Sequence, residues 1–369
     1  MTQRLKVMHV ITGLDVGGAE GMLYALATAP AARELDQSVV SLVPGGHYAA
    51  ALRQAGVRVE SLNIRGVFSL PRGLGALARM IGSEAPDIVQ GWMYHADLLS
   101  LAALYLSGRR KRTRLAWGLR CSVLTGPEFA PALRIARRLW IALSGRPDAI
   151  IANSKAGIGL HAALGMRPRL ALIINNGIDT TRFRPDPQAR ARLRRDWNVP
   201  GAARLIAHVA RVDPLKDHAT FLAAMERLPE ARAILVGRGT EDLPRRANVT
   251  ALGQRDDVPA VLAAADIAVS SSIGEGFSNV LAEGMAAGLP AAATDVGAAR
   301  LILGDSGAIC PPGDPNALAQ ALRTLLEEPP AQWQNRREAV RRRVLENFSL
   351  DRAAAAFITA YRALLENHP

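Results

Sequence analysis

Short β-rich runs alternate with helical stretches along the chain, and this alternation begins a second time in the second half. In the first half the runs end at Ile11, Leu42 and Gly91, and each is followed by apolar residues at helical spacing. In the second half the same order starts again with the run that ends at Val209. A strand–helix–strand rhythm is typical of parallel, doubly wound sheets. The sequence therefore predicts an α/β protein built from two similar halves.

Turn-forming residues mark the change from one half to the other. The stretches 175–179 (NNGID) and 183–187 (FRPDP) interrupt the alternation before it resumes. A chain of 369 residues is also longer than a single hydrophobic core usually supports. We expect a first domain over residues 1–180 and a second over residues 181–349. Ligands of open α/β sheets bind beyond the carboxyl ends of the strands, so we expect the ligand between the two domains.

A loop and a short helix follow the fourth strand of the second half. Ser278 or Asn279 is the predicted N-cap of this helix, and Gly288, which is followed by Leu and Pro, ends it. Glu275 therefore precedes the helix, and Glu283 lies within it. Taken singly, each glutamate is better explained as a solvated loop or helix charge, and only the combination favours a binding role.

The spacing of the two glutamates matches the length of an extended nucleotide sugar. Eight helical residues span about 12 Å, close to the distance from the sugar to the ribose. The diphosphate between these ends would meet the partial positive charge of the helix N-terminus. The residues that would present their backbone there are Gly276, Phe277, Ser278, Asn279 and Val280. We interpret the glutamates as partners of the two hydroxyl-rich ends of such a ligand.

Two further turns from a strand into a helix carry candidate phosphate contacts. Arg211 and Lys216 lie in the turn after the strand that ends at Val209. Two cations repel the positive end of a helix dipole, so their position favours an anion between them, although a solvated loop pair is the alternative. Gly17 and Gly18 follow the first strand, but they lack the spacing of established phosphate-binding loops, and a tight turn explains them equally well.

Together these motifs resemble the family-4 retaining glycosyltransferases of GT-B fold. The resemblance is carried by the Arg211/Lys216 pair, the E-x7-E spacing, AAGLP at 286–290, VGGAE at 16–20 and NGID at 176–179. It implies two Rossmann-like domains whose parallel sheets face each other across a cleft. The second domain would hold the nucleotide sugar and the first domain the acceptor. A last helix over residues 350–369 would return to the first domain.

The resemblance also implies roles for individual residues. Glu275 would act as a catalytic residue near the reacting carbon, Glu283 would bind the ribose hydroxyls, and Arg211 and Lys216 would stabilise the leaving diphosphate. Many relatives carry a histidine where this chain has Arg120, and the nearest histidine is His95. Both are candidates for catalytic residues on the acceptor side, with packing or surface roles as the alternative.

Neither a metal nor another cofactor is expected. The sequence has no clustered His/Asp set and no DxD motif in a plausible loop. The nucleotide sugar, a UDP-, GDP- or ADP-sugar, would be a co-substrate. Stabilisation of a departing diphosphate by cations is electrostatic catalysis and requires no bound metal.

The net charge of +12 is concentrated in the middle of the chain, where residues 101–200 hold 19 Lys and Arg against 5 Asp and Glu. Residues 109–140 combine a basic cluster with a predicted helix that carries Arg, Leu and Trp. Such a surface suits an anionic membrane, whereas the alternative is a solvated basic face with a buried Trp. No nucleic-acid-binding motif or aromatic platform accompanies the charge, so nucleic acid is not an expected partner.

The expected function is transfer of a sugar to a saccharide or lipid-linked saccharide in cell-envelope glycan or polysaccharide biosynthesis. A nucleotide-sugar epimerase of the same fold and a non-catalytic nucleotide-sugar-binding protein are the alternatives. The apolar runs are shorter than the roughly 18 residues of a membrane span, and the chain enters a strand pattern without a cleavable signal. We expect a cytoplasmic protein, peripheral on the inner face of the cell membrane.

Overall fold

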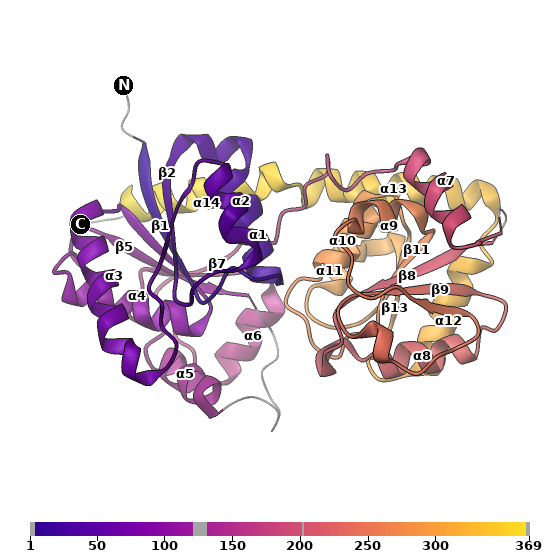
Figure 1. Cartoon of the computed structure of the whole chain (residues 1–369), viewed down its shortest axis with the longest axis horizontal. Coiled ribbons are helices and arrows are strands. Elements are labelled where there is room, and N and C mark those ends of the chain that lie inside the picture. The colour runs from indigo at the N-terminus through magenta and orange to yellow at the C-terminus, as the bar shows by residue number, and fades with distance from the viewer. Residues whose placement is uncertain (1–3, 121–130, 201–202, 367–369) are drawn as a thin grey trace. The chain divides into compact units, whose positions relative to one another are not determined.

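The computed structural model describes residues 4–120, 131–200 and 203–366, and it divides into two compact units. Unit 1 comprises Met1–Gly177 and Leu350–Pro369, and unit 2 comprises Ile178–Ser349 (Figure 1). The chain therefore crosses between the units twice.

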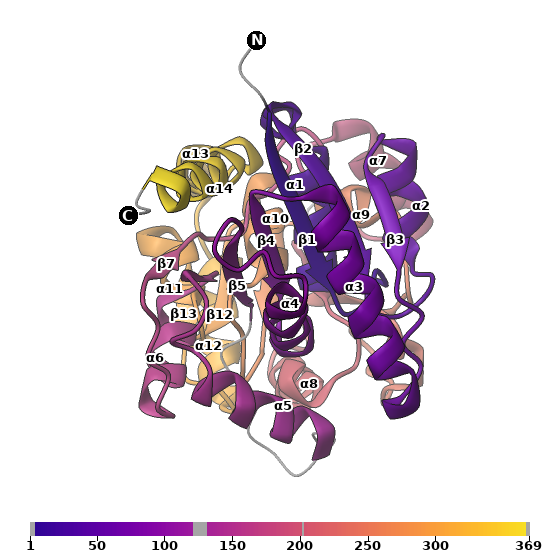
Figure 2. The same cartoon turned by 90° about the vertical axis from the view of Figure 1, so that its left-hand side faces the viewer.

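Within its described residues, unit 1 contains a seven-stranded parallel sheet of order β3-β2-β1-β4-β5-β6-β7. The strands are β1 (Leu5–Ile11), β2 (Leu35–Ser41), β3 (Arg58–Ser61), β4 (Ile88–Trp92), β5 (Arg114–Leu119), β6 (Ala149–Ala152) and β7 (Ala171–Ile173). The helices are α1 (Gly18–Thr28), α2 (His47–Gln54), α3 (Leu70–Glu84), α4 (Tyr94–Leu106), α5 (Pro131–Ala142), α6 (Lys155–Ala163) and α14 (Leu350–Glu366). Helices α3, α4 and α5 share one hydrophobic cluster with the sheet and lie side by side in front of it in Figure 2.

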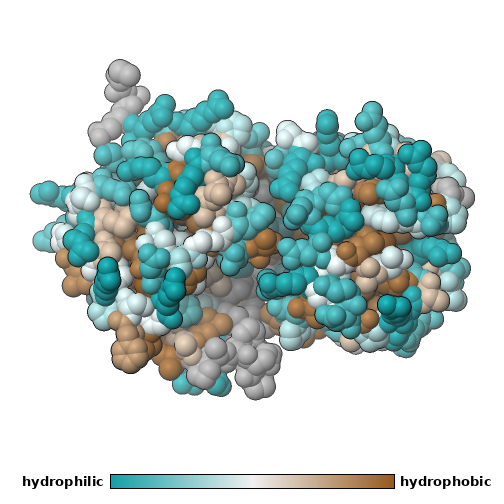
Figure 3. Space-filling view, in the orientation of Figure 1, coloured by the Kyte–Doolittle hydropathy of each residue, from teal (hydrophilic) through white to brown (hydrophobic). Residues whose placement is uncertain are grey.

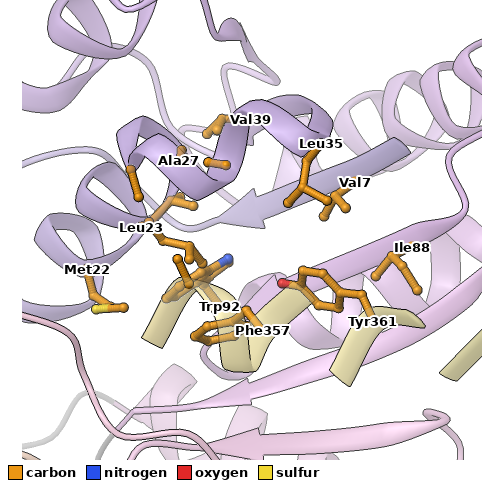
Figure 4. Packing of buried hydrophobic residues seen from close by; sticks show 14 of the residues in the cluster. Val7, Met22, Leu23, Ala27, Leu35, Val39, Ile88, Trp92, Phe357 and Tyr361 are labelled. Atoms are coloured by element: carbon orange, nitrogen blue, oxygen red, sulfur yellow. The ribbon is translucent and has the colours of Figure 1, made fainter. Parts of the chain in front are cut away.

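The other face of this sheet is covered by α1, α2 and α14. Phe357 and Tyr361 of α14 are fully buried, and the Phe357 ring stacks on Trp92 of β4 with the ring centroids 6.2 Å apart. Figure 4 shows both aromatic rings directed into the cluster that Leu23 and Val7 also line. The last helix is therefore a structural part of unit 1.

Unit 2 contains, among its described residues, a six-stranded parallel sheet of order β10-β9-β8-β11-β12-β13. Its strands are β8 (Leu205–Val209), β9 (Arg232–Val236), β10 (Val249–Ala251), β11 (Ile267–Ser270), β12 (Ala291–Thr294) and β13 (Ala308–Cys310). Its helices are α7 (Pro187–Asp196), α8 (His218–Glu226), α9 (Val258–Ala264), α10 (Asn279–Ala286), α11 (Ala299–Leu303), α12 (Pro315–Leu326) and α13 (Pro330–Asn347). The predicted α/β class and the two parallel sheets are confirmed.

Both sheets reverse their strand order at one point. In unit 1 the reversal lies between β1 and β4, and in unit 2 it lies between β8 and β11. The loops after two such strands leave in opposite directions and open a crevice at the carboxyl edge of the sheet. The predicted turns with Gly17, Gly18 and His95 follow β1 and β4, while those with Lys216 and Glu275 follow β8 and β11.

Candidate active site

Two loops meet at the reversal point of the unit 2 sheet. The first leads from β8 through a short 3-10 turn (Pro214–Lys216) into α8, and the second leads from β11 into α10. Strands β8 and β11 are direct neighbours, with Val269 opposite His208. The backbone amide of Ile273 donates to the carbonyl oxygen of Leu215 at 2.9 Å, so the loops are tied to each other.

The predicted residues Lys216 and Glu275 form an ion pair between Nζ and Oε1. The hydroxyl of Ser272 also donates to Glu275 Oε1, at 2.9 Å. The Glu275 side chain is 14% exposed, so this carboxylate is largely withdrawn from solvent and held by two donors. Pairing and partial burial fix its position better than an exposed ion pair would.

Arg211 has its own acidic partner, Asp213, with 3.1 Å between Nη2 and Oδ2. The sequence argument assumed that Arg211 and Lys216 require an external anion. In the structure each cation is instead paired with a carboxylate of unit 2, which already offsets its repulsion from the helix dipole. Arg211 remains about half exposed, and its cation is accessible from solvent.

Helix α10 begins and ends as predicted, at Asn279 after Ser278 and before Gly288. Gly288 has φ 81°, and the amide of Leu289 donates to the carbonyl oxygen of Gly284 at 2.9 Å, which is a Schellman end. A Cβ at Gly284 would lie 2.7 Å from the Cβ of Ala268, so this glycine lets α10 pack directly on β11. The position of the helix N-terminus is thereby set by the sheet.

The predicted backbone contacts Gly276–Val280 lie between Glu275 and the first turn of α10. The Phe277 ring packs against Phe348 with centroids 5.5 Å apart, so only its backbone can face a ligand. The carbonyl oxygen of Gly276 accepts from Ala298 at 2.9 Å. Gly297, at φ 59°, approaches so closely that a Cβ there would lie 2.3 Å from the carbonyl oxygen of Glu275. The 295–298 turn therefore supports this loop from behind.

Glu283 lies on α10, partly buried. Burial raises the pKa of its carboxyl to about 7, an effect that the nearby Arg182 cation opposes. A carboxyl with such a pKa is poorly solvated and changes its charge near physiological pH. It accepts hydrogen bonds well only in its ionised form.

In unit 1, Gly17 is the N-cap of α1 and Gly18 is its first residue. A Cβ at Gly17 would lie 2.3 Å from Oε2 of Glu20, whereas a Cβ at Gly18 would meet no atom within 4 Å. Gly17 thus makes room for a carboxylate of the same helix at its positive end, and Gly18 leaves its backbone open to approach. We found no further contact in the described residues that assigns a ligand to this turn.

His95 and Arg120 are placed differently from each other. His95 is the second residue of α4 and partly buried, and burial lowers its pKa, so the imidazole is neutral at physiological pH. Arg120 directly follows β5 and is only 9% exposed. Its guanidinium lies 4.6 Å from the Trp92 ring centroid, donates to Asn176 Oδ1 at 3.2 Å, and has a pKa that burial lowers to about 10. Arg120 is therefore held inside unit 1.

Ser272 was not singled out from the sequence, although it touches the candidate catalytic carboxylate. The one sequence feature that could have pointed to it is the run of serines at 270–272, at the end of a predicted strand. Residues 4–120, 131–200 and 203–366 contain no group of three or more His, Cys, Asp and Glu side chains that could hold a metal ion. Of the helices in that part of the chain, none is long and apolar enough to cross a membrane.

Comparison with known proteins places each half of the chain in a glycosyltransferase group. Residues 16–182 match the model described as Glycosyltransferase Family 4, and residues 203–328 match the model described as Glycosyl transferases group 1. A phosphatidyl-myo-inositol mannosyltransferase of Mycolicibacterium smegmatis is 33% identical over 174 residues, which is 43% of each protein. The match thus spans less than half the length of that relative.

A longer match is found to the lipopolysaccharide core biosynthesis glycosyltransferase LpsE of Rhizobium meliloti, 26% identical over 88% of this chain and 89% of that protein. Among solved structures, HepE of Anabaena in complex with UDP-glucose has a TM-score of 0.83, with 22% identity, 97% of this chain covered and 100% of that chain. This likeness shows the fold. With both family models matched in succession, the chain belongs to the family-4 glycosyltransferases of GT-B fold.

Proposed function

We propose that this protein transfers a sugar from a nucleotide-sugar donor to a saccharide or lipid-linked saccharide, with retention of configuration, in cell-envelope glycan or polysaccharide synthesis. The observation that carries the proposal is the Lys216–Glu275 pair, which two loops build at the reversal point of the unit 2 sheet. The relatives' names agree with the class: one is a mannosyltransferase, another a core glycosyltransferase.

In this proposal the donor lies along α10. Glu275 faces the sugar, the N-terminus of α10 and the cations Arg211 and Lys216 face the diphosphate, and Glu283 accepts hydrogen bonds from the ribose. As the glycosidic bond breaks, negative charge grows on the leaving diphosphate, and fixed cations and amides stabilise that charge without reorganising. No metal takes part, so turnover is expected to survive EDTA.

On the acceptor side we propose His95, whose neutral imidazole can accept a hydrogen bond from an acceptor hydroxyl. Arg120 supports this side without touching the substrate, because its guanidinium is packed on Trp92 and bonded to Asn176. Gly18, which we propose as a contact of the donor phosphates, offers an open backbone beside the same sheet edge. These roles rest on the family's division of labour between the two domains.

We also propose that α5 contacts an anionic membrane surface, so that the enzyme is peripheral to the inner face of the membrane. Trp140 points inward and is fully buried, whereas Ile135 and Leu139 are 58% and 50% exposed. Arg134 and Arg138 are exposed beside them. Apolar surface is visible over α5 along the lower side of unit 1 (Figure 3). Within the basic cluster before β5, Arg110 already pairs with Asp148 at 3.0 Å.

The first experiment identifies the donor by thermal shift with UDP-, GDP- and ADP-sugars, because a ligand that binds only the folded state raises its stability. The variant Glu275→Gln is then compared with wild type. We expect turnover to fall by about 100-fold or more while donor affinity stays within about threefold, since the carboxylate acts in the transition state.

Glu226→Gln is the matched control, because Glu226 is a half-exposed carboxylate at the end of α8 and is also paired with an arginine, Arg246. Unchanged turnover in Glu275→Gln would refute the catalytic assignment. Isomerised donor sugar in the absence of an acceptor would instead indicate an epimerase, and donor binding with no turnover for any acceptor would indicate a binding protein.

A further inference from the structure

A buried histidine lies directly behind the loop that carries Lys216. His208 of β8 is 2% exposed, and its ring lies 4.7 Å from both the His218 and the Phe221 rings, centroid to centroid. Its Nε2 atom is 3.0 Å from the hydroxyl oxygen of Ser271, which follows β11. Among apolar and aromatic groups, the polar atoms of a histidine can find hydrogen-bond partners only in the few residues that touch it.

The hydrogen-bond geometry determines which group donates. The Ser271 hydroxyl lies 2.9 Å from the carbonyl oxygen of Lys216 and 3.0 Å from that of Asp217, and carbonyls only accept. Ser271 has a single hydroxyl proton, which these two carbonyls share. His208 must therefore carry its proton on Nε2 and donate it to Ser271. Among the residues that the structure describes, its Nδ1 atom meets no hydrogen-bond partner, as a neutral tautomer protonated on Nε2 allows.

The two carbonyls belong to the segment that presents the Lys216 side chain. Asp217 has φ 45° and ψ 57°, a left-handed conformation that is uncommon outside glycine and must be held by its surroundings. Ser271 supplies that restraint from the loop that follows the neighbouring strand β11. Next to it, Ser272 donates to Glu275, so consecutive hydroxyls hold the loop of Lys216 and the carboxylate with which Lys216 pairs.

We propose that Ser271, oriented by His208, is a positioning residue that places Lys216 against Glu275 for sugar transfer. The proposal rests on the proposed function, because it assumes that this pair acts on the donor. Neither side chain needs to touch the substrate. A substitution of Ser271 should therefore affect sugar transfer only by displacing Lys216.

The test is a double-mutant cycle between Ser271→Ala and Lys216→Met, measured as release of nucleoside diphosphate from the donor that the thermal-shift screen selects. We expect Ser271→Ala to lower kcat/KM by about tenfold, since it leaves the His208 N–H and two loop carbonyls without their partner. In the Lys216→Met background the same change should lower kcat/KM by less than about twofold, because the group through which it acts is gone.

Three further measurements separate positioning from general loss of stability. Ser271→Thr retains the hydroxyl and should restore kcat/KM to within about threefold of wild type. Hydrogen exchange of residues 213–217 should accelerate in Ser271→Ala and not in Ser271→Thr. Thr113→Val is the control, since it removes a fully buried hydroxyl that donates to Pro86 at 2.7 Å in unit 1, and it should leave kcat/KM unchanged.

Wild-type kcat/KM in Ser271→Ala, or the same fold-loss in both backgrounds, would overturn the inference and leave the proposed function standing. If Lys216→Met itself retained full turnover, the assignment of the donor site would be wrong, and the inference would fall with it. These results are distinguishable because the single Lys216 variant reports on the proposed function alone.

Discussion

The Glu283 carboxyl, which we propose to bind the ribose, lowers the stability of the folded state when it is ionised. It lies partly buried on α10, and burial raises its pKa from 4.5 to about 7, with Arg182 opposing this rise. Above pH 7 the folded state must hold a poorly solvated charge that the unfolded state exposes to water. The cost in folding stability is therefore present at alkaline pH. It disappears as the pH falls towards 4.5, the pKa of this carboxyl in the unfolded chain.

Glu283→Gln is expected to be more stable than wild type at pH 8 by about 2 kcal/mol, after allowance for partial exposure, and equally stable near pH 4.5. Chemical denaturation at both pH values measures this difference. In wild type, donor affinity should fall as pH decreases through 7, because the protonated carboxyl accepts hydrogen bonds poorly, whereas the variant should bind weakly at all pH values. A variant less stable than wild type at pH 8 would contradict this account.

Some residues of this site could be predicted from the sequence and others could not. Lys216 and Glu275 were predictable because each follows a β-rich run into a helix, and parallel strands bring such turns to one edge. Ser271 and His208 were not, because their role depends on which carbonyls face the hydroxyl after two strands pair. For Arg120 the sequence left open whether it lines the acceptor side or packs within the protein, and only the structure shows the aromatic rings of Trp92 and Phe357 against its guanidinium.

At the scale of single elements, α5 exposes apolar side chains on its outer face. Its inner face, with Ala136 and Trp140, packs in the cluster of α3 and α4. Its outer face combines exposed Ile135 and Leu139 with exposed arginines. The sequence predicted a helix that carries Arg, Leu and Trp and left open whether the Trp is buried. The packing shows that Trp140 belongs to the core and that Ile135 and Leu139 do not.

Wild-type protein is expected to sediment with liposomes that contain anionic lipid, and binding should weaken at high salt because the arginines act through screened charge. Ile135→Ser with Leu139→Ser should lower binding by about tenfold, as two apolar side chains no longer enter the lipid. Leu345→Ser is the control, since Leu345 is 40% exposed on α13 of unit 2. Equal binding to neutral liposomes, or no salt dependence, would rule out this surface.

At the scale of the whole chain, the sequence predicted the two sheets but not which of them each helix covers. When strands alternate with helices and the connections are short, only a few arrangements of parallel strands are possible. The two α/β halves could therefore be predicted from local sequence patterns. The place of α14 did not, because apolar residues at helical spacing suit either sheet. The family resemblance assigned it to the first domain, and in the structure Phe357 and Tyr361 complete the core of unit 1.

This assignment predicts where the chain loses stability when α14 is altered. Phe357→Ala removes a fully buried ring that stacks on Trp92, which typically costs about 3 to 5 kcal/mol. Hydrogen exchange should accelerate in β1, β4 and α14 and remain unchanged in β8 and β11. Phe221→Ala, which removes an equally buried ring of unit 2, should give the opposite pattern. Equal acceleration in both units for either variant would show that they unfold together, so that α14 stabilises more than the sheet on which it packs.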